Sequence, residues 1–197
     1  MCIAAIADQS VQAKRKASRS HGTVIPGIAV GELRLGDSKS RALTLFPFKP
    51  NIDQEYQSVC GRELNWVDRK KPYAGNIFIH FQDNMVLQID AATTRFETAD
   101  GITAGMSPEK VQAHYTKLRA YVLSNVTSGA FGERPLIYWV DRDSGIAFAF
   151  AYSKTLHIRY LYDIAIFHPN SEICPMNGPI NSSDKRELPP YSLEPNQ

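Results

Sequence analysis

Leu33-Arg-Leu-Gly-Asp-Ser38 and Ile102-Thr-Ala-Gly-Met-Ser107 share one design: a short apolar segment, a glycine turn and a serine that can cap a helix. Apolar residues at helical spacing follow each serine, and a tryptophan strand follows each helix, first Asn65-Trp-Val-Asp-Arg69 and then Tyr138-Trp-Val-Asp-Arg142. A pattern that recurs along a chain indicates a repeat architecture. The sequence therefore predicts an α+β fold of two tandem repeats, each a short helical motif packed on an antiparallel sheet.

These boundaries divide the chain into four segments: an N-terminal arm (1–25), repeat 1 (26–98), repeat 2 (99–168) and a Pro-rich, extended C-terminal tail (169–197). Within the arm, Met1-Cys-Ile-Ala-Ala-Ile-Ala7 is either the remnant of a signal peptide or an ordinary frayed terminus. The arm also carries Lys14, Arg15, Lys16 and Arg19. Such a run is more often a solvated tail than a contact with an anionic surface.

Composition excludes several classes of protein. Of 197 residues, 43% are hydrophobic and 10% aromatic, as in an ordinary globular protein. A formal charge of +2 does not favour nucleic acid as a partner. No apolar run approaches the roughly 20 residues that cross a bilayer, so we expect no transmembrane segment.

Helices are predicted after each serine. One runs from Ser38 to Phe46, and the spacing of apolar residues adds a turn or two over 51–59. A longer helix begins at Ser107 and Pro108 and carries an apolar stripe that lies at Val111, Tyr115, Leu118 and Val122.

Strands are predicted over 64–68, 76–81, 85–92, 136–141, 145–152 and 156–167, with Asp83-Asn84 as a hairpin turn. Alternation predicts that one face of the first hairpin packs on the helices, with Ile77, Ile79, Phe81, Met85, Leu87 and Ile89. In the second repeat, an alanine face is open to a partner or to packing by another element: Ala147, Ala149 and Ala151. Trp66 and Trp139 have the parity of core anchors, with a solvent-facing binding role as the alternative.

The sequence contains no phosphate-binding glycine loop, zinc-protease pair, nucleophile elbow or kinase signature. Three cysteines without metal spacing predict no zinc site, and we expect no cofactor. Cys60 and Cys174 either form a disulfide in an oxidising compartment or remain free buried thiols. His80 and His157 could meet on one sheet face, with Asp90 or Asp163 to orient a ring, as a candidate general base.

The recurring glycine-x-serine turn, helix and tryptophan strand resemble the tandem-repeat family typified by the beta-lactamase inhibitory protein. Each unit is also similar to the small outer-membrane assembly lipoproteins of the same half-fold. The resemblance covers residues 26 to 168 and implies two joined sheets whose concave surface grips another protein. The matching outward positions are Phe78, His80, Gln88, Asp90, His157 and Arg159. The inhibitor has a disulfide in each repeat, whereas here one unit has only Cys60 and the other has none, so inhibition of a beta-lactamase is not carried over.

The sequence thus predicts a non-enzymatic protein, secreted or periplasmic, that binds a protein partner of unknown identity through an exposed sheet face. The alternative is a small hydrolase or ligand-binding protein that uses His80 and His157 with nearby acids.

Overall fold

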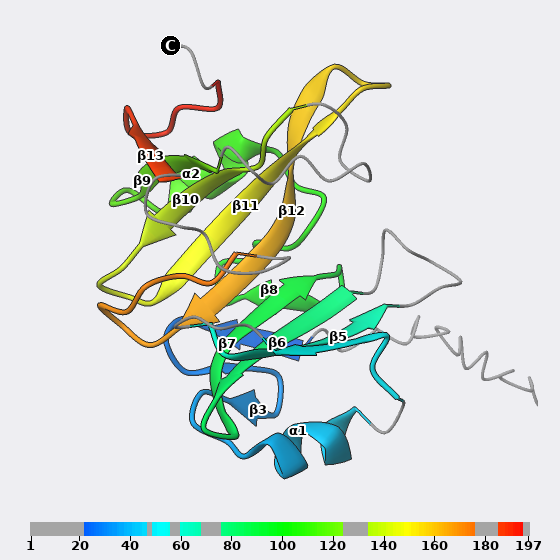
Figure 1. Cartoon of the computed structure of the whole chain (residues 1–197). Helices are drawn as coiled ribbons and strands as arrows, with labels where there is room; N and C mark the ends of the chain where they lie inside the picture. Colours follow the sequence, from blue (N-terminus) through cyan, green and yellow to red (C-terminus); the bar gives the residue numbers. More distant parts are fainter. Residues whose placement is uncertain are drawn as a thin grey trace, which may run out of the picture.

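The computed structural model describes residues 22–46, 49–55, 60–67, 76–123, 134–175 and 185–194, and it is mostly β (Figure 1). About 10% of these residues are helical and 49% lie in strands. The predicted α+β class, with a helical motif packed on each sheet, is therefore wrong. Most of the predicted arm lies outside the described residues, and so does Asp68 at the end of the first predicted strand.

The strands form a sheet of four and a sheet of nine. The small sheet consists of β1 (Gly22–Ile25), β2 (Ala29–Val30), β3 (Leu33–Arg34) and β8 (Phe96–Thr98). The large sheet takes its nine strands from two parts of the chain. The first part supplies β4 (Ile52–Glu55), β5 (Arg62–Val67), β6 (Asn76–Gln82) and β7 (Met85–Ala92). The second supplies β9 (Arg119–Leu123), β10 (Ile137–Asp141), β11 (Ile146–Ser153), β12 (Ile158–Phe167) and β13 (Lys185–Leu188).

The large sheet is antiparallel throughout, in the order β13-β9-β10-β11-β12-β7-β6-β5-β4. Its two parts meet where β12 pairs with β7, with Ile164 opposite Ala91. The division of the chain into two copies stays a prediction. Part of the predicted C-terminal tail belongs to the sheet, because β13 pairs with β9.

Each of the two helices in the described part of the chain has seven residues. Helix α1 (Lys39–Leu45) begins as predicted, because the Ser38 hydroxyl accepts a hydrogen bond from the Arg41 N–H. Helix α2 (Pro108–His114) ends earlier than predicted. Beyond it, β9 contains Tyr121 and Val122, residue types that favour strands, and it pairs with β10 and β13. Val122 therefore lies on a strand. The predicted helical turns over 51–59 are also wrong where the structure describes them, since Ile52–Glu55 is β4.

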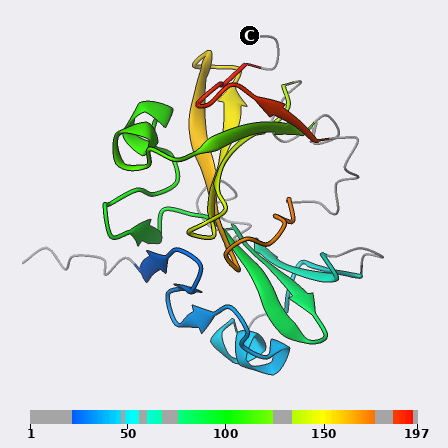
Figure 2. The same ribbon diagram turned by 90° about the vertical axis from the view of Figure 1, so that its left-hand side faces the viewer.

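One face of the large sheet packs against the small sheet and the helices (Figure 2). Both tryptophans lie in this core, as predicted, with Trp66 8% and Trp139 1% exposed. The indole N–H of Trp139 donates to the Ser192 carbonyl oxygen at 3.0 Å. Seven-residue helices cannot cover a nine-stranded sheet, and Val24, Val30 and Leu33 of the small sheet share that task.

The opposite face is also buried. The three alanines of β11 are at most 1% exposed, and they pack with aromatic residues of neighbouring strands such as Tyr138 and Phe167. The segment 168–175, which follows β12, lies on this side of the sheet, away from the helices (Figure 2), and its Ile173 packs into the cluster. Of the two predicted states of the alanine face, packing by another element is therefore the observed one.

Candidate functional site

The six predicted site residues fall into two places. Four of them lie near the centre of the large sheet beside the segment 168–175: Phe78, His80, Gln88 and Asp90. The other two lie at the far end of β12, where His157 is exposed and Arg159 is buried. The prediction that all six face solvent is wrong for five of them, which are between 0% and 6% exposed. Strand parity identified the common face of Phe78, His80, Gln88 and Asp90 but could not show that another segment covers it.

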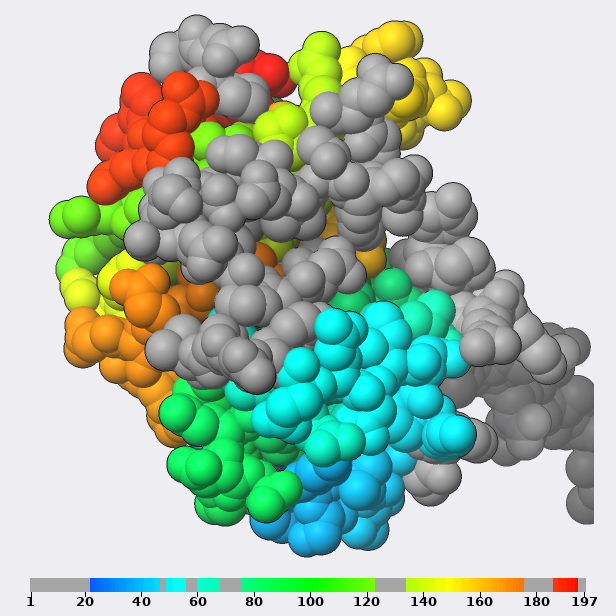
Figure 3. All heavy atoms as spheres, in the orientation of Figure 1, coloured from blue at the N-terminus to red at the C-terminus, as the bar shows by residue number. Residues whose placement is uncertain are grey.

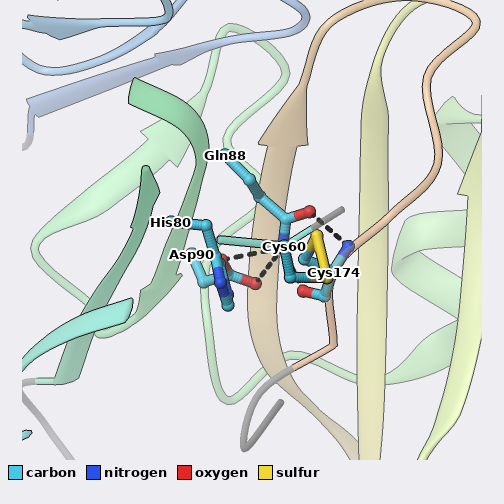
Figure 4. Close-up of a disulfide and its surroundings, with 5 residues drawn as sticks. All are labelled: Cys60, His80, Gln88, Asp90 and Cys174. Carbon is cyan, nitrogen blue, oxygen red and sulfur yellow. Dashed lines mark hydrogen bonds and ion pairs between the residues drawn. A yellow bond between two sulfur atoms is a disulfide. The ribbon is translucent and has the colours of Figure 1, made fainter. Parts of the chain in front are cut away.

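A disulfide joins Cys60, just before β5, to Cys174, which lies 114 residues further along the chain (Figure 4). The side-chain amide of Gln88, on β7, binds both backbone polar groups of Cys174. Its amide nitrogen donates to the Cys174 carbonyl oxygen, and its amide oxygen accepts from the Cys174 N–H at 2.7 Å. The pairing of the two cysteines, left open by the sequence, is thus observed together with a second attachment of the same segment.

Beneath the disulfide lies a buried cluster of ionisable groups, which we call the acid cluster: Glu63, His80, Asp90 and Asp163. All four are 0% exposed. The Gln88 amide nitrogen lies 2.9 Å from both Asp90 carboxyl oxygens, and the His80 Nε2 lies 3.8 Å from Oδ2 of Asp90 (Figure 4).

The protonation of the acid cluster follows from burial. Burial, and next the neighbouring charge of Asp163, raise the pKa of Asp90 well above its usual range. Burial raises the pKa of Asp163 to about 7, although a hydrogen bond with Asp90 acts in the other direction. Burial also lowers the pKa of His80 to about 4, against a smaller effect of the Cys60 backbone. The distance between His80 and Asp90 alone would allow an ion pair, but both pKa directions favour a neutral pair at this depth.

Two β-bulges direct side chains into the acid cluster. The register of β11 and β12 shifts between Ala149 and Phe150, which sets Asp163 opposite Ala149 on the second face. The register of β6 and β7 shifts after His80, so Val86 enters the main core and Gln88 remains opposite His80. Because of this shift, the predicted core face of the first hairpin is wrong at Met85, which is 47% exposed.

The other two predicted residues line an open pocket of about 460 Å³ at the end of β11 and β12. Arg134 stacks over the ring of Tyr152, with 4.0 Å from its guanidinium carbon to the ring centroid. The Tyr152 hydroxyl lies 3.3 Å from Nδ1 of His157. Arg159 enters from the pocket wall with its side chain 3% exposed, and Glu194 lies between the two arginines.

Sequence reasoning missed Arg134, Glu194 and Glu63. The pocket joins a residue before β10 to one near the C-terminus, and no local motif indicates such a meeting. Asp163 did carry a signal, because it is an acid inside the otherwise apolar run at the end of β12. It was expected only as a partner for a histidine.

The described residues contain neither a candidate metal site nor a candidate membrane-spanning helix. No three histidine, cysteine, aspartate or glutamate side chains among them could hold a metal ion together. Within the same part of the chain, no helix has the length and apolar character to cross a bilayer.

Comparisons with known proteins give a structural likeness but no family. No protein-family model matches the chain, and neither does any curated protein sequence. Among solved structures, the chain is similar to the uncharacterized protein yfeY from Escherichia coli, with 13% identity and a TM-score of 0.47. That match covers 75% of this chain and 99% of the other.

Proposed function

We propose that the protein is an exported, non-enzymatic protein that binds a protein partner through the tip of the β11–β12 hairpin. The observation that carries this proposal is the exposure of two large aliphatic residues there, Leu156 at 66% and Ile158 at 51%. The tip projects at the upper right of Figure 3. Exposed aliphatic side chains beside an arginine and a tyrosine are typical of binding surfaces.

Neighbouring contacts support a stable shape for this tip. Arg134 stacks on Tyr152, which in turn contacts His157. A surface that is already ordered loses less entropy on binding. The hairpin tip therefore replaces the covered sheet face as the surface on which a partner docks.

Binding is favoured over the hydrolase alternative because of the positions of the two histidines. A general base must reach its substrate, and His80 is 0% exposed beneath the disulfide. His157 has Tyr152, on the exposed hairpin, as its neighbour. The pair that the alternative requires is thus split between a closed core and an open tip.

The disulfide supports export, either secretion or residence in the periplasm. Bonds of this kind persist in oxidising compartments and are rare where thiols are kept reduced. Both cysteines are at most 2% exposed, and the bond fastens a segment over the buried acid cluster. A structural role of this kind requires the bond to form and persist wherever the protein works.

The test is quantitative affinity capture from the source cell's envelope fraction with the full chain as bait. We expect at least one partner to be retained by the native protein and reduced about tenfold or more by L156D/I158D, as when an interface anchor is lost. The matched control is I25D/I28D, because Ile25 and Ile28 are also exposed apolar residues, at 40% and 42%. Equal retention by all three proteins would refute the hairpin tip as the binding surface.

A further inference from the structure

The pocket beside the hairpin tip contains an arginine whose orientation is fixed while one edge of its guanidinium makes no hydrogen bond. The Nη1 of Arg159 donates to the carbonyl oxygens of Pro135, at 3.0 Å, and Phe150, at 3.2 Å. These bonds set the plane of the guanidinium. Within the described part of the chain, its Nε and Nη2 are buried and have no hydrogen-bond partner.

Nε and Nη2 lie on the same edge of a guanidinium, the edge that can hold the two oxygens of a carboxylate side by side. Burying charged donors without partners is costly, so a site of this kind gains when an acceptor arrives. Arginine stays charged even though burial lowers the pKa of Arg159. This unpaired edge is therefore a permanent donor pair.

A carboxylate of the chain itself already lies near this edge. Oε1 of Glu194 is 3.9 Å from Nε of Arg159, beyond hydrogen-bond distance, whereas it is 3.1 Å from Nη1 of Arg134. Glu109 also lines the pocket, but Ser107 hydrogen bonds its carboxylate and lowers its pKa. One acidic side chain thus lies between two arginines and satisfies only the outer one.

We propose that the Nε–Nη2 edge of Arg159 binds a carboxylate of the partner, and that Glu194 gives way to it. This inference rests on the proposed function, because the apolar neighbours of that carboxylate would contact Leu156 and Ile158. Ile158 itself lines the pocket, so the apolar and the acidic contacts lie next to each other. A carboxylate is favoured as the ligand group because the group of the chain that lies nearest this edge, the side chain of Glu194, is itself a carboxylate.

The test is an NMR titration of the full chain that follows the Arg159 Nε–H resonance. The probes are two acetylated, amidated tripeptides, Leu-Glu-Leu and Leu-Gln-Leu. We expect the glutamate peptide to shift this resonance and the glutamine peptide to leave it unchanged. The measurement on native protein needs no variant, so the proposal can be tested even if a substituted chain fails to fold.

Three variants sharpen the result. R159K keeps the charge but loses the paired donors, so we expect about tenfold weaker binding of the glutamate peptide. E194Q should bind that peptide about threefold or more tightly, because the competing charge is gone. R119K is the matched control, since Arg119 is an exposed arginine that pairs with Glu187 elsewhere, and its affinity should equal that of the native protein.

The outcomes separate this inference from the proposed function. Equal binding of both peptides, lost in L156D/I158D, would overturn the carboxylate site and leave the hairpin surface intact. Failure of the glutamate peptide to bind E194Q would also overturn it, because Glu194 would then be part of the site and not its competitor. Loss of partner capture in L156D/I158D with no peptide effect at Arg159 would refute only the carboxylate site.

Discussion

Single buried side chains give this protein opposing responses to pH. His80 has a folded pKa of about 4, below its ordinary value of 6.5, so its contribution to stability is lost as the pH falls through that window. Asp163 has a folded pKa of about 7, above its ordinary 3.8, so its contribution is lost as the pH rises from about 4 to 7. Between about pH 4 and 6.5 the two effects oppose each other, and Asp90, whose pKa is also raised, adds to the effect of Asp163.

Removing either group should expose the effect of the other. In D163N, the slope of the free energy of unfolding against pH between 4.5 and 6.5 should be more positive than in the native protein. In H80Q the free energy of unfolding should instead fall with pH over the same range. Each slope should change by up to about 1.4 kcal/mol per pH unit, one proton's worth. Urea unfolding at a series of pH values measures this, and curves parallel to the native one in both variants would contradict it.

For single residues, the sequence predicted which face of the sheet a side chain lies on better than it predicted what covers that face. Alternation correctly placed Phe78, His80, Gln88 and Asp90 on one face, and Asp90 does lie beside His80. Their burial could not be predicted, because it depends on a disulfide to a residue 114 positions away. Arg134 and Glu194, which meet Arg159 in the pocket, lie far from it in the sequence, so the pocket had no local signal.

At the scale of elements, the turn between β10 and β11 is bonded to two other segments of the chain. The Gly145 carbonyl oxygen accepts hydrogen bonds from the N–H of Gly27, at 3.2 Å, and of Phe167, at 3.1 Å. Gly145 has a φ of 69°, in the left-handed region, and a Cβ there would press on the Phe167 carbonyl oxygen. The turn after β1, the turn after β10 and the end of β12 therefore approach one another only because this residue has no side chain.

We predict that G145A destabilises the protein by roughly 2 kcal/mol or more, because it combines backbone strain with a backbone clash. G36A is the matched control. Gly36 has a similar φ of 80°, but a Cβ at that position meets nothing within 4 Å. Its cost should be the strain alone, about 1 kcal/mol. Denaturant midpoints for the two variants test the difference, and equal losses would contradict the role of the clash.

Elements were predictable from sequence where local chemistry decides them. Asp83 and Asn84 have φ values of 51° and 62°, as the predicted hairpin turn requires. The predicted long helix after Ser107 failed because Val122 satisfies a helical spacing and a strand alternation equally well. Pairing with β10 and β13 decides between them, and that pairing cannot be read locally.

For the molecule as a whole, the disulfide is a second connection between the two parts of the large sheet. Among the described strands, those of the two parts pair only through β7 and β12. Cys60 precedes β5 in the first part, and Cys174 follows β12 in the second. The bond therefore closes a long loop around that junction.

Reduction should lower the free energy of unfolding by about 2 to 5 kcal/mol, as expected for a native bond that closes a long loop. Guanidinium unfolding with and without a thiol reductant measures the change. C60S/C174S should match the reduced native protein and should not respond to the reductant. A native protein whose midpoint is unaffected by full reduction would show that the bond contributes nothing to stability.

Strand β13, the last of the described strands, pairs with β9 but is synthesised after β10, β11 and β12. Cys174 likewise emerges from the ribosome long after Cys60. During synthesis the growing polypeptide therefore has neither its closing strand nor its cross-link. We expect it to remain loosely folded until β13 and Cys174 have both been made.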